Sequence, residues 1–310
     1  MQLKSYFLLV RWPNLLMVAL TQYLLQYLVL SPALAQAGRS PTLDPLHFFL
    51  LVFVTVIIAA GGYIINDLFD YEADVVNKPD KVFIHAHIKR DHAIWLYAKL
   101  VVLGSIIALY LANHVEERRL VLIYPSAVGL LWLYSRYFKK MPLIGNVVVA
   151  VFCAFVAGVV LFAERKAFSD LATEQPALAG KVSLLFGGYL LFAFLSTLFR
   201  EIVKDMEDAA GDKAQSVQSL PVAYGMAAAK NWGFASALLL LSSLLYFSKW
   251  LIENRQWIGL SFTWISIVLP LLYAMFLLKK AAGKSDCTRL SKLAKYIMLA
   301  GLILLLLIWK

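Results

Sequence analysis

The chain has 310 residues, of which 61% are hydrophobic and 15% are charged, and its mean hydropathy is +0.74. Soluble domains carry about 25% charged residues, so this composition excludes an ordinary soluble protein and predicts an integral membrane protein. The formal net charge is +10, but the 29 lysines and arginines are dispersed over short segments. We therefore expect contacts with anionic membrane lipid and no nucleic-acid binding.

Apolar runs of about 20 residues, the length that crosses a hydrocarbon layer of about 30 Å, recur along the whole chain. They lack the alternating pattern of β-strands, so the fold class predicted is all-α, with a single polytopic domain over residues 1–310. The nine predicted spans are 13–31, 45–66, 92–112, 119–137, 143–163, 182–202, 231–250, 257–278 and 292–309.

Lysine and arginine are distributed unequally between the two ends of these spans. Nineteen of them fall on one predicted side of the membrane and nine on the other, with Lys99 inside a span. The richer side of a membrane protein is normally cytoplasmic. This predicts a multi-pass protein of the cell inner (cytoplasmic) membrane, with its N-terminus in the cytoplasm and its C-terminus outside.

Two acidic clusters follow the second and the sixth span. The first is "NDLFDYEAD" at 66–74, and the second is "KDMEDAAGD" at 204–212. Each has aspartates at positions i, i+3 and i+7, which lie on one face of a helix and predict a carboxylate stripe at its end. The aspartates are Asp67, Asp70 and Asp74 in the first cluster, and Asp205, Asp208 and Asp212 in the second. Both spans run in the same direction, so both stripes emerge on the predicted cytoplasmic side and indicate two pseudo-repeats.

Two facing stripes would repel each other unless cations lay between them. Oxygen-only ligands favour Mg²⁺, which keeps coordination positions for substrate phosphate, so we predict a magnesium diphosphate between the stripes. Basic residues near both clusters are candidates for binding the outer diphosphate oxygens. They are Lys78, Arg136, Lys139, Lys140, Arg200, Lys204 and Lys213.

The acidic clusters allow two other interpretations. Acids at helix ends are often simply solvated, but the duplication at identical spacing argues against this. Acids within membranes also mark the ion paths of transporters, and repeats are common there. Here the acids gather at the membrane edge instead of the midplane, which favours an enzyme.

The sequence resembles the UbiA superfamily of intramembrane prenyltransferases. The two aspartate motifs, "RWPNLLM" in the first span and "YSRYFKKMPLIGN" between the fourth and fifth carry the resemblance. It implies a helical bundle around a central cavity, capped on the cytoplasmic side by motif loops at 66–91 and 203–229, and Mg²⁺-dependent prenyl transfer without an obligate protein partner. The metal ligands it implies are Asn66, Asp67, Asp70, Asp74, Asp205, Asp208 and Asp212, and we expect the largest catalytic effects at Asp70, Asp74, Asp208 and Asp212.

The substrates follow from the same resemblance and from the chemistry of an allylic cation. Aromatic faces stabilise such a cation, so Tyr63 and Tyr134 are candidate substrate-binding residues, together with Arg11, just before the first span, and Asn14 within it. The stretch "REIVKDMEDAAGDK…SLPVAYG" is most similar to sequences of the branch that transfers geranylgeranyl to geranylgeranylglyceryl phosphate.

The stretch after the first motif, "NKPDKVFIHAHIKRDH", departs from the common family pattern and leaves the acceptor open. A phosphorylated lipid is the preferred acceptor because basic residues are abundant beside the motifs. The alternative is an aromatic acceptor of quinone biosynthesis, of the 4-hydroxybenzoate or 1,4-dihydroxy-2-naphthoate type. His85, His87 and His92 in this stretch have no Cys or further His nearby, so we interpret them as a polar cap and not as a zinc site.

Overall fold

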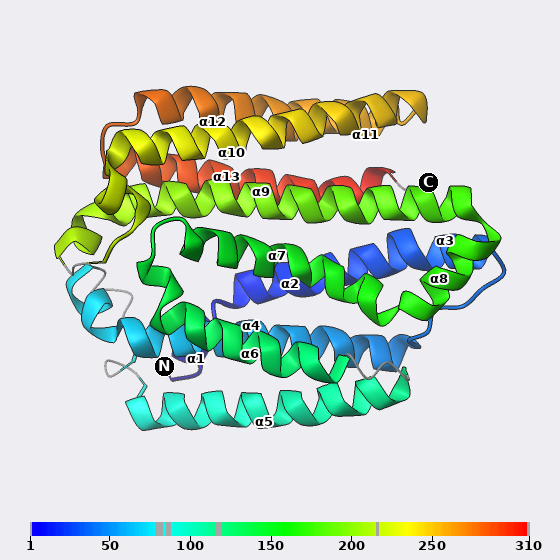
Figure 1. Ribbon diagram of the computed structural model, residues 1–310, viewed down its shortest axis with the longest axis horizontal. Helices are drawn as coiled ribbons and strands as arrows, with labels where there is room; N and C mark the ends of the chain where they lie inside the picture. Colours follow the sequence, from blue (N-terminus) through cyan, green and yellow to red (C-terminus); the bar gives the residue numbers. More distant parts are fainter. Residues whose placement is uncertain (1, 78–82, 85–87, 116–119, 215–216, 309–310) are drawn as a thin grey trace.

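The computed structural model of the chain describes residues 2–77, 83–84, 88–115, 120–214 and 217–308; the side chains at 2, 3, 72–74, 76 and 77 lie outside that description. These residues form long helices that run side by side along one direction (Figure 1), one isolated β-bridge between Ile84 and Ile88, and no strand. The helices are α1 (Gln2–Leu9), α2 (Trp12–Leu24), α3 (Ser31–Gln36), α4 (Pro45–Asn77), α5 (Arg90–His114), α6 (Leu120–Arg136), α7 (Ile144–Ala163), α8 (Arg165–Glu174), α9 (Pro176–Ala214), α10 (Leu220–Glu253), α11 (Trp257–Thr263), α12 (Leu269–Lys280) and α13 (Lys284–Ile308).

Two short π-helical segments join neighbouring helices into longer rods. The segment η1 (Leu25–Leu30) connects α2 to α3, and η4 (Trp264–Val268) connects α11 to α12. With these connections, eight helices of the described chain are long and apolar enough to cross a membrane. Each corresponds to one of the nine predicted spans. The remaining one, 119–137, is helix α6, which has 17 residues with Pro125 inside, so the count of nine is not established.

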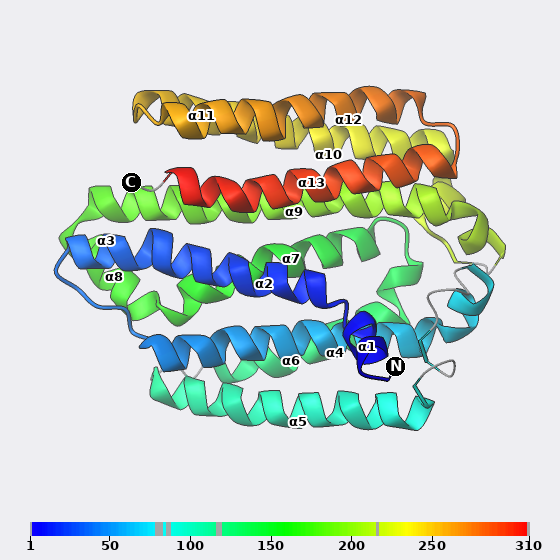
Figure 2. The ribbon, with the colours of Figure 1, turned by 180° about the vertical axis from the view of Figure 1, so that it is seen from behind.

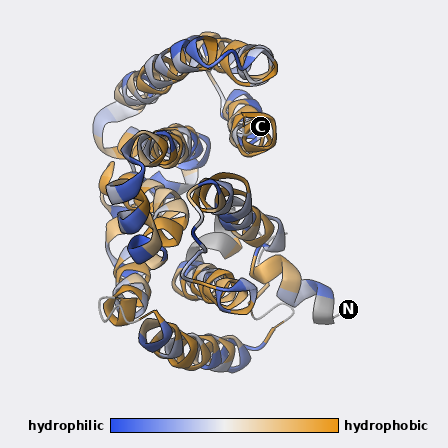
Figure 3. Ribbon diagram, turned by 90° about the vertical axis from the view of Figure 1, so that its right-hand side faces the viewer, coloured by the Kyte–Doolittle hydropathy of each residue, from blue (hydrophilic) through white to orange (hydrophobic). Residues whose placement is uncertain are grey.

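Large apolar side chains remain exposed on the outside of the bundle. The end-on view in Figure 3 shows hydrophobic residues on the outer as well as the inner sides of the helices. Ile258 is 72% exposed, Tyr246 is 67% exposed and Leu122 is 66% exposed. In water such surfaces would drive aggregation, whereas in a bilayer they contact acyl chains of similar polarity. The exposed surface therefore agrees with an all-helical membrane domain.

The two motif helices are long, with 33 residues in α4 and 39 in α9. Helix α4 packs against α2, α5 and α6, and helix α9 packs against α7, α10 and α13. Their C-terminal ends, which carry the motifs, lie at the same end of the molecule, on the left in Figure 1 and on the right in the reverse view of Figure 2. The fold therefore brings two segments far apart in sequence to one end of the bundle.

The first part of each expected motif loop is helical, as the expected carboxylate stripes at helix ends require. Residues 66–77 continue α4, and residues 203–214 continue α9, so much of the segments 66–91 and 203–229 is helical. The motif residues include good helix formers such as Ala, Glu, Lys and Met, and proline first appears after the first motif at Pro79. The carboxylate stripes are thus presented by rigid helix ends.

The opposite end of the bundle is fastened by a buried carboxylate at the end of α7. Glu164 accepts hydrogen bonds from the backbone N–H of Thr42 at 2.6 Å, the N–H of Leu43 at 3.2 Å and Nε2 of Gln26 at 2.9 Å. Burial raises the pKa of Glu164, and these donors partly oppose that shift. The contacts fix the connection between α3 and α4 at the end away from the motifs.

Candidate active site

The break between α1 and α2 directs a basic side chain toward the first motif. Arg11 has a left-handed backbone, with φ 52° and ψ 52°, just before the helix that begins with Trp12 and Pro13. Its Nη2 donates to Oδ1 of Asp67 at 2.9 Å, and its guanidinium lies 4.7 Å from the ring centre of Tyr63. Such positions are strained for residues other than glycine and are enriched at functional sites.

Asn14, one turn further along α2, joins the group formed by Arg11, Tyr63 and Asp67. Its Nδ2 donates to the hydroxyl oxygen of Tyr63 at 3.1 Å. Three residues predicted to bind substrate, Arg11, Asn14 and Tyr63, therefore meet beside Asp67, a predicted metal ligand.

The first motif is organised around Asp70. Its Oδ2 accepts a hydrogen bond from Nδ2 of Asn66 at 2.7 Å and pairs with Nζ of Lys139. The same lysine lies 3.4 Å from Oδ1 of Asn66. Asp74 lies one turn further along α4, and its side chain is outside the described part of the chain. Two predicted metal ligands and one predicted diphosphate ligand thus form a single cluster.

Lys139 reaches this cluster because a tight turn packs on the start of α7. The turn η3 (Phe138–Lys140) lies so close to Gly145 that a Cβ atom there would be 2.9 Å from the carbonyl oxygen of Phe138 and 3.1 Å from Cα of Lys139. A hydrogen atom at this position permits the contact, and any side chain would push the turn away.

We therefore expect Gly145→Ala to lower prenyl transfer by about tenfold to a hundredfold, because a displacement of about 1 Å at a catalytic group has effects of that size. Turnover and melting temperature of the purified variant are the measurements. Gly129→Ala on α6 is the matched control, since no atom lies within 4 Å of a Cβ built there. Wild-type turnover in Gly145→Ala would show that the turn does not position Lys139 for the reaction.

The second motif holds its aspartates with different partners. Asp205 accepts a hydrogen bond from Nδ2 of Asn146 at 2.9 Å, and Asp208 lies 3.4 Å from Nζ of Lys204. Asp212 follows one turn later and is half-buried. Asn146 was missed by the sequence analysis, although it is the last residue of the quoted stretch "YSRYFKKMPLIGN". Its position next to Gly145 is the signal that could have drawn attention to it.

Tyr134, a predicted substrate-binding residue, lies near the end of α6, and its side chain is half-buried. Its hydroxyl is within electrostatic range of Asp70 from the first motif and of Asp205 from the second, and also of Glu201 and Arg11. The sequence placed Tyr134 among the substrate-binding candidates but did not indicate that acids of both motif helices lie in its range.

Other predicted residues are not brought into the cluster. Arg200 pairs with Glu201, its neighbour on α9, and Arg136 lies 5.8 Å from the ring centres of both Phe69 and Tyr137. Three further residues with exposed side chains are Lys140, Lys213 and His92. Lys78, His85 and His87 lie outside the described residues.

The donor set fits a hard divalent cation. The described side chains of the two motifs offer carboxylate and amide oxygens, the ligands that Mg²⁺ prefers. Asp67, Asp70 and Asp208 each already pair with a basic side chain. These carboxylates are thus arranged to neutralise positive charge.

A multi-pass helical bundle with paired aspartate motifs and basic side chains at one end defines the class of integral membrane enzymes that act on diphosphates. The UbiA prenyltransferase family model matches residues 24–305, nearly the whole chain. The protein belongs to the UbiA prenyltransferase family. The predictions of this family, of its all-helical fold and of a prenyltransferase are confirmed.

Relatives from archaea are similar over most of their length. The chain is 31% identical to the digeranylgeranylglyceryl phosphate synthase of Methanocaldococcus jannaschii, over 83% of this chain and 82% of that protein. It is 30% identical to the enzyme of the same name from Saccharolobus solfataricus, over 97% of this chain and 94% of the relative.

Solved structures show the same fold. A structure described as digeranylgeranylglyceryl phosphate synthase in membranes has a TM-score of 0.66 and 27% identity, covering 99% of this chain and 98% of its own. A UbiA homolog from Archaeoglobus fulgidus bound to GPP and Mg²⁺ has a TM-score of 0.54 at 17% identity, covering 97% of this chain and 99% of its own.

Proposed function

We propose that this protein transfers a geranylgeranyl group from its diphosphate to geranylgeranylglyceryl phosphate, with Mg²⁺ as cofactor. The observation that carries the proposal is that the two aspartate motifs lie at the same end of the bundle (Figure 1), with Lys139 on Asp70 and Lys204 on Asp208. The names of the relatives from Methanocaldococcus jannaschii and Saccharolobus solfataricus support the choice of acceptor.

The proposed metal and diphosphate ligands come from both motif helices. On α4 they are Asn66, Asp67, Asp70 and Asp74; on α9 they are Asp205, Asp208 and Asp212. When bound there, Mg²⁺ would stabilise the negative charge that develops on the diphosphate as the allylic C–O bond breaks.

In this proposal the lysine and arginine side chains near the motifs help to bind the diphosphate. Lys139 and Lys204 now neutralise aspartates that a metal ion would otherwise neutralise. If these carboxylates bound the metal, the two ammonium groups would be available to bind diphosphate oxygens. Lys78, Lys140, Arg200 and Lys213 are proposed to contribute through the positive potential around the mouth of the site.

The organic part of the donor is proposed to lie on the inner side of Tyr63 and Tyr134. Asn14 holds the hydroxyl of Tyr63, and Arg11 covers one face of that ring, so the ring has a fixed orientation. Aromatic faces stabilise an allylic cation in a space without water. Arg11 also adds a guanidinium fork, which suits the phosphate group of the proposed acceptor.

The test is a competition assay with purified enzyme in detergent. Geranylgeranyl diphosphate is offered with geranylgeranylglyceryl phosphate, 4-hydroxybenzoate and 1,4-dihydroxy-2-naphthoate, and products are identified by mass. We expect the diether phosphate as product, and its loss with EDTA and recovery with added Mg²⁺. An aromatic product alone would overturn the acceptor but leave the reaction class, whereas no product under any condition would overturn the class.

We further propose that the motif end of the bundle faces the cytoplasm of a cell inner membrane, with the C-terminus outside. The unequal distribution of lysine and arginine supports this orientation. In a background without cysteine, a single cysteine at Lys140 is expected to resist an impermeant thiol reagent in sealed cells and to react after lysis. Labelling from outside intact cells would reverse the proposed topology.

A further inference from the structure

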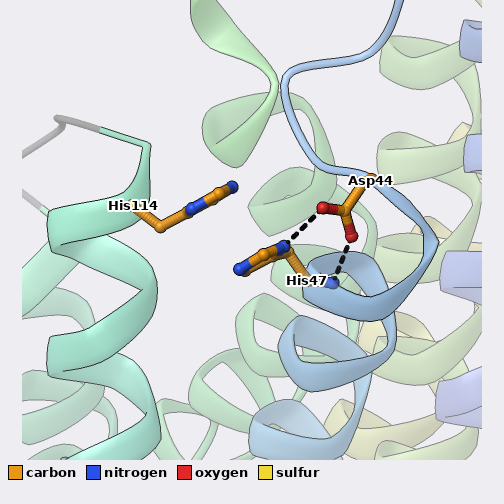
Figure 4. Close-up of side chains that lie close together, drawn as sticks. All are labelled: Asp44, His47 and His114. Atoms are coloured by element: carbon orange, nitrogen blue, oxygen red, sulfur yellow. Dashed lines mark hydrogen bonds and ion pairs between the residues drawn. The ribbon is translucent and has the colours of Figure 1, made fainter.

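A second group of metal-binding side chains lies at the end of the bundle opposite the motifs. Asp44 immediately precedes α4, His47 lies in its first turn, and His114 is the last residue of α5. At about 1.5 Å per residue, α4 separates Asp44 from the first motif by about 33 Å. Figure 4 shows the three side chains facing one another. They are therefore distinct from the diphosphate site.

Asp44 and His47 are held in fixed orientations. Oδ1 of Asp44 accepts hydrogen bonds from the backbone N–H of Leu46 at 2.9 Å and of His47 at 3.0 Å, which caps α4. The other oxygen, Oδ2, lies 2.8 Å from Nδ1 of His47. On the far side of the imidazole, Nε2 lies 2.9 Å from the hydroxyl of Tyr110. One carboxylate oxygen and one ring nitrogen thus face each other.

His114 brings a third donor to the same place. Its ring is parallel to that of His47, with centroids 3.4 Å apart and an angle of 4° between the planes. One ligand atom from each of Asp44, His47 and His114 lies within 4.8 Å of the other two. No described residue makes a hydrogen bond to the ring nitrogens of His114, and its side chain is exposed. Imidazole nitrogens bind metal in the plane of the ring, so His114 would have to turn out of its stack with His47 to share an ion with it, and its exposed side chain leaves room for that turn.

We propose that Asp44, His47 and His114 bind a zinc ion. Two imidazole nitrogens and one carboxylate oxygen are a common zinc ligand set, with the fourth position left for water. Tyr110 acts as an outer partner: by holding Nε2 of His47, it directs Nδ1 toward the ion, as second-shell groups do in zinc sites. The nitrogen ligands distinguish this site from the oxygen-only motifs, which suit Mg²⁺.

The bound ion would join the beginning of α4 to the end of α5. Helix α5 packs mainly on α4 and α6, at the edge of the bundle in Figures 1 and 2. A ligand that binds only the folded state stabilises it by mass action. Zinc is therefore expected to raise the melting temperature without taking part in prenyl transfer.

The experiment compares purified wild type with His114→Ala in detergent. Both proteins are incubated with Zn²⁺ in the presence of excess Mg²⁺, which occupies the aspartate motifs, and bound zinc is measured by elemental analysis after gel filtration. We expect wild type to retain one zinc ion per chain more than His114→Ala, and zinc to raise the melting temperature of wild type alone. His92→Ala, at the other end of α5 and also exposed, is the matched control and is expected to bind zinc like wild type.

A second variant and a spectroscopic probe test the same zinc site independently of His114→Ala. Asp44→Asn keeps a good cap for α4 but loses the anionic ligand, so it is expected to lose the extra zinc while remaining folded. With Co²⁺ in place of zinc, wild type is expected to give the strong visible bands of a four-coordinate site with nitrogen ligands, and His114→Ala is expected to lack them. Equal zinc content and equal cobalt spectra in wild type and both variants would overturn the proposal.

Discussion

Asp70→Ala and Asp208→Ala are each expected to lower turnover at least about a hundredfold, equivalent to about 2.7 kcal/mol of activation free energy. Each removes a carboxylate from the proposed ligand set on one of the two motif helices. Asp70 is the acceptor for Asn66 and Lys139, and Asp208 is paired with Lys204, so both substitutions also release a lysine. Release of product from radiolabelled prenyl diphosphate under saturating Mg²⁺ measures the effect.

Glu207→Ala is the matched control for Asp208→Ala. It removes an acid from the adjacent position of α9, but Glu207 accepts a hydrogen bond from the hydroxyl of Thr288 on α13 at 2.7 Å and lies off the aspartate stripe. We expect turnover close to wild type. The folded state should survive all three substitutions, because partly exposed ion pairs contribute only about 0–1 kcal/mol to stability. Near-normal turnover in both aspartate variants, with gel filtration unchanged, would refute the assignment of the motifs.

Lys139→Ala is expected to have the next largest effect, a loss of about a hundredfold in turnover, the lower end of the range for removal of one group that stabilises developing charge. Lys140→Ala should change turnover by no more than about threefold. The two lysines are neighbours in the turn η3, yet Lys139 contacts Asp70 and Asn66 whereas Lys140 is exposed. The pair therefore separates direct contact from general positive charge.

Steady-state kinetics with varied prenyl diphosphate distinguish these two explanations. If Lys139 acts through direct contact, Lys139→Ala should lower kcat, and this loss should persist at high salt. A contribution from the general field appears equally in both variants and weakens as salt screens exposed charges, since the screening length is about 8 Å at physiological ionic strength. Equal losses in the two variants would contradict a special role for Lys139.

Local spacing predicted the motif helices well. The i, i+3, i+7 pattern of Asp67, Asp70 and Asp74 and its copy in α9 depends only on helical periodicity, so the sequence contains all the information needed. The predicted spans end at 66 and 202, whereas α4 continues to Asn77 and α9 to Ala214, because hydropathy marks where a chain leaves the membrane and not where its helix ends.

The partners within the site could not be predicted in the same way. The bond from Asn146 to Asp205 joins α7 to α9, and Lys139 meets Asp70 across α4 and the turn η3. Such pairs depend on how helices cross, which single-sequence patterns do not encode. The cluster of Asp44, His47 and His114 was missed for the same reason, since its members come from the start of α4 and the end of α5.

The resting ion pairs have a thermodynamic consequence for the order in which ligands bind. Lys139 on Asp70 and Lys204 on Asp208 compete with any metal ion that approaches the motifs alone, so free Mg²⁺ should bind weakly. A diphosphate that arrives with the metal offers the displaced ammonium groups new anionic partners. The two ligands should therefore bind cooperatively, and linkage requires each to raise the affinity of the other by the same factor. Substituting both lysines with alanine would remove the ion pairs that oppose metal binding and also the lysine contacts to the diphosphate. The affinity for each ligand should then depend less on the presence of the other.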